Sequence, residues 1–185
     1  MRRVYGGSVT PARQVPAATV RLNQGMVLTA FLVAATVTAG LSAGLFYTFF
    51  FSVMPGLGST DDRTFVAAMQ WINARILNGW FAIAFVGAPL LTVAAAIVAL
   101  AAPGDATGTR PWTIAAAVLA LATVAITAAA NVPLNNMLEA AGEPDKIVDP
   151  AGLRARFERP WVRWNNVRTA TSVAAFACMV GALAS

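Results

Sequence analysis

Charged residues are missing from four long stretches of this chain, and this spacing restricts the possible folds more than any other feature. The charge-free stretches lie between Arg21 and Asp61, between Arg75 and Asp105, between Arg110 and Glu139, and after Arg168. A helix needs about 20 apolar residues to cross the hydrocarbon core of a bilayer. The sequence therefore predicts an all-α integral membrane protein, a four-transmembrane-helix up-down bundle with spans at about 26–52, 77–101, 112–133 and 161–183.

The overall composition supports a membrane protein. Charged residues make up 11% of the chain and hydrophobic residues 58%, whereas a soluble domain carries about 25% charged residues. Too little charge remains to cover a surface that faces water, so we expect a multi-pass protein of the cell membrane with the lipid bilayer as its partner. The net charge of +5 is scattered along the chain, which argues against a nucleic-acid partner.

The chain contains no histidine and a single cysteine, Cys178. The missing histidine excludes His-ligated haem, zinc, copper or iron and every Ser–His or Cys–His mechanism. A lone cysteine cannot form a disulfide within the chain. We accordingly expect no metal site and no cofactor.

The first 25 residues carry four arginines and no acidic residue, without an apolar periodicity. We interpret 1–25 as a disordered basic tail ahead of a four-span membrane domain over 26–185, with a transit peptide as the alternative. Basic residues occur both in this tail and in the polar segment 140–160. The distribution of positive charge therefore indicates no single orientation in the membrane.

Turn residues predict the main connections. Thr60 or Asp61 is suited to cap a helix that we expect to continue and merge into the second span. The segment 140–160 contains three prolines and many polar residues, so it is predicted to be the one substantial loop.

Small and aromatic residues mark the first span. Gly40 and Gly44 form a GxxxG pair, whose small surface lets helix backbones approach closely, inside the bundle or between the protomers of an oligomer. Farther along lie Tyr47 and four phenylalanines, a cluster typical of an interfacial aromatic belt. Tyr47 is the member whose hydroxyl can donate a hydrogen bond to a ligand.

Polar and aromatic side chains share one face of the fourth span. Trp161, Trp164, Asn165 and Arg168 follow one another at i, i+3, i+4 and i+7. The chain continues from Arg168 only to Ser185, which gives about 26 Å of helix against a hydrocarbon core of about 30 Å. Arg168 is thus expected near the hydrocarbon boundary, either among other helices or with its guanidinium extended to the headgroups.

The third span ends in the sequence NVPLNNMLE, with a proline among three asparagines. Pro133 lacks a backbone N–H and frees a carbonyl near Ala129, which then needs a partner. Asn131 and Asn135 stand four residues apart and flank this break. Their amides are candidates to satisfy the interrupted helix end.

The same end of the bundle is expected to collect three polar clusters. In an up-down bundle the connections 54–78 and 134–165 lie on one side of the membrane. Asn73, in the first connection, therefore approaches the ends of the third and fourth spans. We predict one polar pocket, in which the two asparagines of the third span face Asn165 and Arg168.

Four motifs together resemble a known family. They read, in chain order, GLFYTFFFSVMPGL, FVAAMQWINARI, NVPLNNML and WVRWNNVRT. The chain resembles the anthrone oxygenase-like family of small four-span membrane proteins, first catalogued as a domain of unknown function. The resemblance covers about residues 40–170, and its most specific parts are the N-x-P-L-N and W-x-x-W-N-x-x-R-T patterns.

The resemblance implies oxidation of an anthrone to an anthraquinone by dioxygen, with no metal or flavin. Such a protein binds a flat apolar substrate, takes up a proton and stabilises an oxyanion. The residues expected to hold the oxyanion are Arg168, Asn131, Asn135 and Asn165, with Glu139 as the candidate general base. The residues expected to bind the substrate are Trp161, Trp164, Tyr47 and Asn73.

Two functions of different classes remain open at this point. One is a cofactor-independent monooxygenase acting on a lipophilic aromatic compound. The other is a non-catalytic membrane protein that uses the same polar mouth to bind a lipid, a quinone or a partner protein. A transporter is less favoured, because no pair of broken, related helices is apparent.

Overall fold

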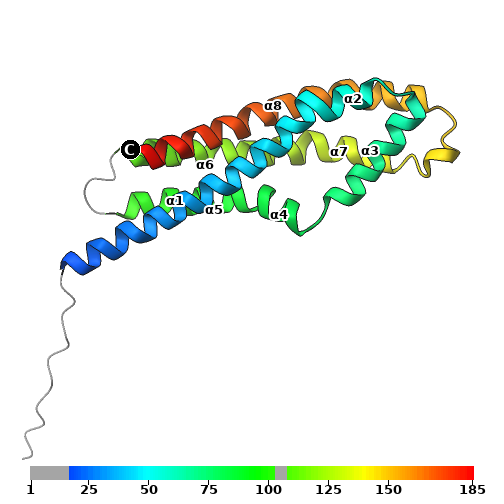
Figure 1. The fold of residues 1–185 in the computed structure, drawn as a ribbon. Coiled ribbons are helices and arrows are strands. Elements are labelled where there is room, and N and C mark those ends of the chain that lie inside the picture. The colour runs from blue at the N-terminus through cyan, green and yellow to red at the C-terminus, as the bar shows by residue number, and fades with distance from the viewer. Residues whose placement is uncertain (1–16, 103–107) are drawn as a thin grey trace, which may run out of the picture.

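The computed structural model describes residues 17–102 and 108–185, and nearly all of them are helical. Four helical segments in this part of the chain are long and apolar enough to cross a membrane: Leu22–Gly58, Gly79–Ala101, Thr109–Glu139 and Pro150–Ala184. They run up and down side by side (Figure 1). The predicted all-α bundle with four spans is therefore confirmed.

The elements follow one another in the order of the expected spans. The first span consists of α1 (Ala17–Thr48), a π-helical turn η1 (Phe49–Val53) and α2 (Met54–Gly58). Next come α3 (Asp62–Ile76), α4 (Gly79–Phe85) and α5 (Gly87–Ala101). The second half contains α6 (Thr109–Ile126), the π-helical turn η2 (Thr127–Asn131), α7 (Val132–Glu139), the 3₁₀ turn η3 (Pro144–Lys146) and α8 (Pro150–Ala184).

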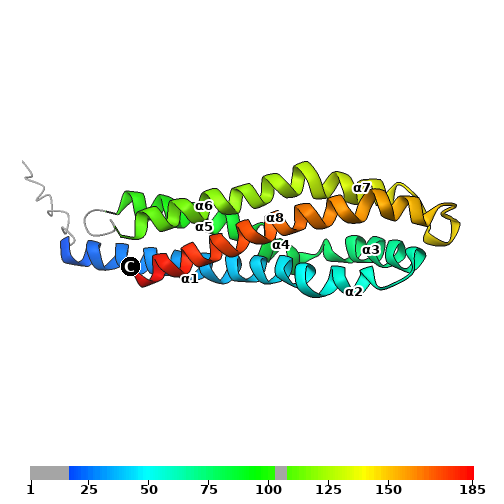
Figure 2. The same ribbon diagram turned by 90° about the horizontal axis from the view of Figure 1, so that it is seen from above.

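Three of the four spanning segments are much longer than the hydrocarbon core of a bilayer is thick. The 35 residues of α8 correspond to about 52 Å of helix, against a hydrocarbon core of about 30 Å. The excess lies at one end of the bundle, where α2, α3, α7 and the first half of α8 gather away from the C-terminus (Figures 1 and 2). We call this end the projecting half, and the remainder the membrane half.

Two boundaries differ from the sequence-based expectation. The polar segment 140–160 is not one loop, because α8 begins at Pro150 and continues through Pro160. The Asp149 side chain caps this helix by accepting a hydrogen bond from the Gly152 N–H at 2.8 Å. The boundary expected at residue 25 falls inside α1, and residues 1–16 of the expected tail lie outside the described residues.

The helix before the second span does not merge into it. Asp61 caps α3 as expected, accepting a hydrogen bond from the Thr64 N–H at 3.0 Å. However, α3 ends at Ile76, and Asn78 starts a new helix by accepting hydrogen bonds from the N–H groups of residues 80 and 81. An asparagine side chain in this position replaces the backbone partners that the first turn lacks. The result is a joint between α3 and α4.

Each π-helical turn is followed by a proline in the second position of the next helix, Pro55 after η1 and Pro133 after η2. In both cases the N–H of the residue after the turn bonds to the carbonyl five residues earlier. Because proline offers no N–H, the regular ladder is interrupted there, and the π turn absorbs the mismatch. Turns of this kind occur often at functional sites.

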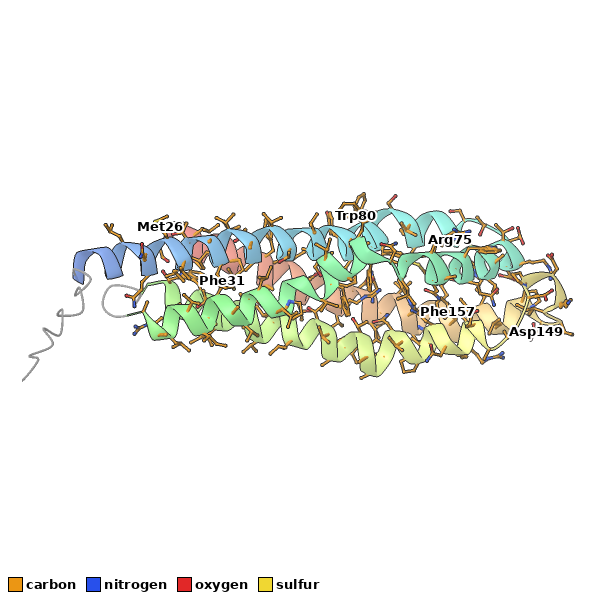
Figure 3. All side chains as sticks on the ribbon, turned by 90° about the horizontal axis from the view of Figure 1, so that it is seen from below. Met26, Phe31, Arg75, Trp80, Asp149 and Phe157 are labelled. Carbon is orange, nitrogen blue, oxygen red and sulfur yellow. The ribbon has the colours of Figure 1, made fainter. Side chains whose placement is uncertain are left out.

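Two hydrophobic cores fill the bundle. The core of the membrane half consists mainly of small residues, among them Ala35, Ala95 and Ala116 packed around Met179. In the projecting half the buried residues are larger, and Phe157 lies inside that part of the bundle (Figure 3). Gly40 serves packing within the bundle, since a Cβ atom there would lie 3.1 Å from the Phe176 ring.

Polar contacts fasten the projecting half together. Arg154 on α8 donates hydrogen bonds to the carbonyls of Gly58 and Thr60 and pairs with Asp62 at 3.1 Å. Gln70 on α3 donates to the Leu138 carbonyl at 2.8 Å and to a second carbonyl beyond α7. These bonds hold α3 between α7 and α8.

Candidate functional site

A cavity of about 450 Å³ lies where the membrane half meets the projecting half, and we call it the junction cavity. Its apolar wall combines aliphatic side chains with five aromatic rings, which are Phe46 and Phe49 from the first span, Phe81 and Phe85 from α4 and Trp161 from α8. Its polar wall consists of Asn73, Thr127, Asn135, Asn136, Glu139 and Arg168. The cavity therefore draws residues from all four spans and from α3.

Arg168 is the cation of this cavity. Its side chain is 7% exposed, and its guanidinium lies 4.4 Å from the centre of the Phe46 ring and 5.0 Å from that of Trp161. No carboxylate among the described residues pairs with it. A buried charge without a counter-ion is costly. The attraction of the two ring faces offsets only part of that cost, which leaves the site favourable for an anionic oxygen.

Asn165 sets the position of the guanidinium. Its side-chain oxygen accepts a hydrogen bond from Arg168 Nε at 3.1 Å, and its amide nitrogen donates to the Phe46 carbonyl at 3.4 Å. Asn165 itself is fully buried behind the cavity wall. The two terminal nitrogens of Arg168 have no protein partner within residues 17–102 and 108–185, so they remain available to a ligand.

Trp161 connects the asparagines of the third span to α8. Its indole Nε1 donates to Asn135 Oδ1 at 2.8 Å, and its carbonyl accepts a hydrogen bond from Asn131 Nδ2 at 3.4 Å. Asn135 and Arg168 line the same cavity, but the asparagine pair bonds to Trp161 and not to Arg168. Asn131 is fully buried, and its side-chain oxygen has no partner in the described part of the chain.

Glu139 and Asn73 lie in the wall on the projecting side. Glu139 is exposed, and it lines both the junction cavity and a second, outer hollow of about 360 Å³. Asn73 lines the junction cavity, and its amide nitrogen is buried without a hydrogen-bond partner among the described residues. The carboxylate thus reaches the cavity and the outer hollow at once.

Four expected site residues do not line the cavity: Asn131 and Asn165 are fully buried, and Tyr47 and Trp164 face outwards. Tyr47 is 49% exposed and packs its ring 4.9 Å from that of Phe51 on the outer surface. Trp164 is 38% exposed and does not contribute to the wall. Three residues turn a helix by about 300°, so Trp164 stands about 60° away from Trp161 and falls at the outer edge of the shared face.

Sequence reasoning missed the contribution of α4. Phe81 and Phe85 stack at 5.0 Å between ring centres, and Phe85 meets Phe46 edge to face at 6.2 Å. Their i, i+4 spacing directly after the Asn78 cap is the signal that predicts a shared aromatic face. Its significance became visible only once α4 was placed beside α1.

The arrangement suits one kind of ligand. Aromatic walls favour a flat apolar molecule, because ring stacking and area burial both contribute to its binding. Arg168 favours an oxygen on that molecule that is, or becomes, negatively charged. A carboxylate in the wall adds a group able to accept a proton.

Comparison with known proteins gives one match. A family model described as anthrone oxygenase matches residues 79–178. The matched part contains the asparagines of the third span, Glu139, Trp161 and Arg168, and it excludes Asn73 and the phenylalanines of the first span. No curated protein and no solved structure matches the chain.

Proposed function

Because the chain belongs to the anthrone oxygenase family, we propose that it is a membrane oxygenase that oxidises a lipophilic, anthrone-type substrate with dioxygen and without a cofactor. The observation that carries this proposal is Arg168, a buried cation with no carboxylate partner among the described residues, held against aromatic rings in a cavity of about 450 Å³.

The reaction needs little from the protein. Removal of one proton from the CH₂ group of an anthrone gives an aromatic enolate, with its charge on the former carbonyl oxygen. The enolate transfers an electron to dioxygen, and a carbon–oxygen bond forms at the deprotonated carbon. The resulting peroxide anion takes back the proton, and the hydroperoxide loses water. One substrate and one dioxygen thus give one quinone and one water, so the protein acts as a monooxygenase.

Arg168 is proposed to stabilise the enolate anion that forms in this reaction. Its free terminal nitrogens are proposed to bind the enolate oxygen, with Asn135 in the same cavity wall as a further polar partner. Removing one such donor from an enclosed site costs about 3–4 kcal/mol of transition-state stabilisation. Asn165 acts as a positioning residue, because it holds the guanidinium without lining the cavity.

Glu139 is the proposed base. It is the carboxylate in the cavity wall, and its exposure lets it exchange protons with water, so that the abstracted proton can be returned to the peroxide. Trp161, Asn73 and the phenylalanines of α1 and α4 are proposed to hold the rings of the substrate. Asn131 supports Trp161 from behind.

The test uses purified protein in lipid nanodiscs with anthrone as the probe. Oxygen uptake and quinone absorbance are recorded together, and the oxygen-to-quinone ratio is expected to be one. Arg168→Gln is expected to lower kcat by about 10²–10³-fold. The matched control is Arg163→Gln, on the same helix but exposed. Equal rates for wild-type protein and Arg168→Gln contradict the proposal.

The exposure of Glu139 favours a second candidate, a non-catalytic protein that binds a quinone or lipid in the junction cavity. A quinone carbonyl is an acceptor for the same guanidinium, and binding requires no base. The two candidates differ in one measurement. If a quinone binds and Arg168→Gln weakens that binding, but anthrone oxidation equals the spontaneous rate, the binding protein is favoured.

A further inference from the structure

The junction cavity opens through a mouth between α3 and α7. Several residues of its wall are exposed at the surface, and these define the mouth: Ala74, Leu77, Val132, Asn136 and Glu139. The first two belong to the C-terminal end of α3 and the residue that follows it, and the other three belong to α7. The chain runs towards the membrane half in α3 and away from it in α7 (Figure 1).

The mouth has an apolar end and a polar end. Because the two helices run in opposite directions, Leu77 and Val132 lie at the end nearer the membrane half. Leu77 is 76% exposed and Val132 is 42% exposed. Glu139 makes the other end polar, and it lines the outer hollow there together with Ala74.

Two independent lengths place the apolar end at the edge of the hydrocarbon core. The segment Gly79–Ala101, which begins just after Leu77, has 23 residues, or about 35 Å of helix against a core of about 30 Å. Val132 is separated from Thr109, the start of α6, by a similar length of helix.

Exposed aromatic rings support the same position for the edge of the hydrocarbon core. Trp80 is 83% exposed and projects from the outer surface close to the α3–α4 joint (Figure 3). Tyr47 and Trp164 are also exposed, on helices that pass the same level of the bundle. Tryptophan and tyrosine are enriched at the membrane–water interface.

We propose that the junction cavity is loaded sideways from the bilayer, by a flat lipophilic molecule that passes between Leu77 and Val132, while the Glu139 end of the mouth remains in water. The nature of the molecule rests on the proposed function, whereas the route rests on the mouth itself. A substrate dissolved in lipid then reaches Arg168 without crossing water, and only protons and small products use the polar end.

The first experiment tests the route without any enzymatic activity. Leu77→Cys and Val132→Cys are made in a Cys178→Ser background and labelled with a polarity-sensitive fluorophore in nanodiscs. Nitroxide lipids carrying the label near the headgroup are expected to quench both positions, whereas aqueous iodide is expected to quench the control Val148→Cys, which is 98% exposed in the projecting half. Quenching of positions 77 and 132 by iodide alone overturns the route.

The second experiment uses a larger side chain to narrow the mouth at its apolar end. Anthracene dissolved in the nanodisc lipid serves as the probe, and its entry is followed by energy transfer from tryptophan. Val132→Phe is expected to slow entry, because the larger side chain narrows the gap to Leu77, whereas Leu121→Phe, at a 51% exposed position on α6, leaves the entry rate unchanged. Equal entry rates for both variants overturn the proposal.

The two experiments separate the route from the chemistry. If anthracene enters as expected but anthrone is not oxidised, the proposed function fails and the route stands. If the wild-type protein takes up no anthracene, the cavity does not bind a flat aromatic molecule. Sideways loading by such a molecule is then rejected.

Discussion

The guanidinium of Arg168 lies 5.0 Å from the centre of the Trp161 ring, and the Nε1 of the same indole donates a hydrogen bond to Asn135. One side chain thus connects the cation of α8 to the interrupted end of the third span. This connection holds the cavity wall in place beside the π-helical turns η1 and η2, where the regular α-helical hydrogen bonds of the first and third spans are interrupted. It also makes Trp161 the residue whose replacement is most informative about the site.

Trp161→Phe is expected to keep the aromatic packing but leave Asn135 Oδ1 without its donor. Because this bond is only partly buried, its loss costs about 0.5–1.5 kcal/mol, so thermal unfolding in detergent shifts to lower temperature. Trp80→Phe provides the matched control, because that indole is 83% exposed. Equal shifts in the two variants would show that the Trp161 hydrogen bond does not stabilise the bundle.

Arg168→Met is expected to raise the stability of the folded bundle while removing its function. The methionine fills similar space and removes the cost of a buried, unpaired charge. We expect this gain to exceed the cost of about 1–3 kcal/mol for leaving Asn165 Oδ1 without its donor. Thermal unfolding and anthrone oxidation are measured on the same preparation, with Arg163→Met as the control. A joint loss of stability and activity instead identifies Arg168 as a structural residue.

Asn165→Asp is expected to weaken binding of an anionic aromatic ligand. The new carboxylate pairs with Arg168 Nε at the position of the present hydrogen bond and neutralises the cation. The measurement is the Kd of anthracene-9-carboxylate, and the control is Asn166→Asp, the exposed neighbour. Unchanged affinity in Asn165→Asp contradicts the role assigned to the guanidinium.

The stability of α3 is expected to depend on acid pH through Asp61. Hydrogen bonds from the Thr64 side chain, and then from its backbone N–H, lower the pKa of Asp61. A lowered pKa in the folded state stabilises the helix above the unfolded-state value, about 3.9, and this stabilisation is lost as pH falls through the folded value.

Hydrogen exchange of α3 amides across this acid range measures the effect. Asp61→Asn keeps a capping side chain that does not titrate, so the pH dependence of protection in α3 is expected to become weaker. Asp145→Asn, at an exposed position outside α3, serves as the control. The assignment to Asp61 is contradicted if the wild-type pH dependence persists in Asp61→Asn.

Gly40 and Gly44 are expected to respond differently to a larger side chain. A Cβ atom at Gly40 meets the Phe176 ring at 3.1 Å, whereas at Gly44 it meets nothing within 4 Å. Gly40→Val therefore lowers the unfolding temperature in detergent, and Gly44→Val leaves it unchanged. Light scattering on Gly44→Val tests the remaining role of this face, because a change in mass identifies it as a contact between protomers.

The number and approximate place of the spans could be predicted from the sequence alone. The thickness of the bilayer sets the length of each apolar segment, and the exclusion of charge from lipid is a property of that segment by itself. The Asp61 cap was equally accessible, because a cap depends only on its own helix turn.

Tertiary structure decided which way each side chain faces. Tyr47 and Trp164 have the chemistry of ligand-binding residues, yet the rotation of their helices against their neighbours turns both outwards. Phe81 and Phe85 entered the cavity wall because α4 packs beside α1. The rotation of a helix about its axis depends on the shapes of the helices around it. The residue pattern of one segment gives no information about the shapes of its neighbours. The junction cavity and its mouth could therefore be recognised only in the assembled bundle.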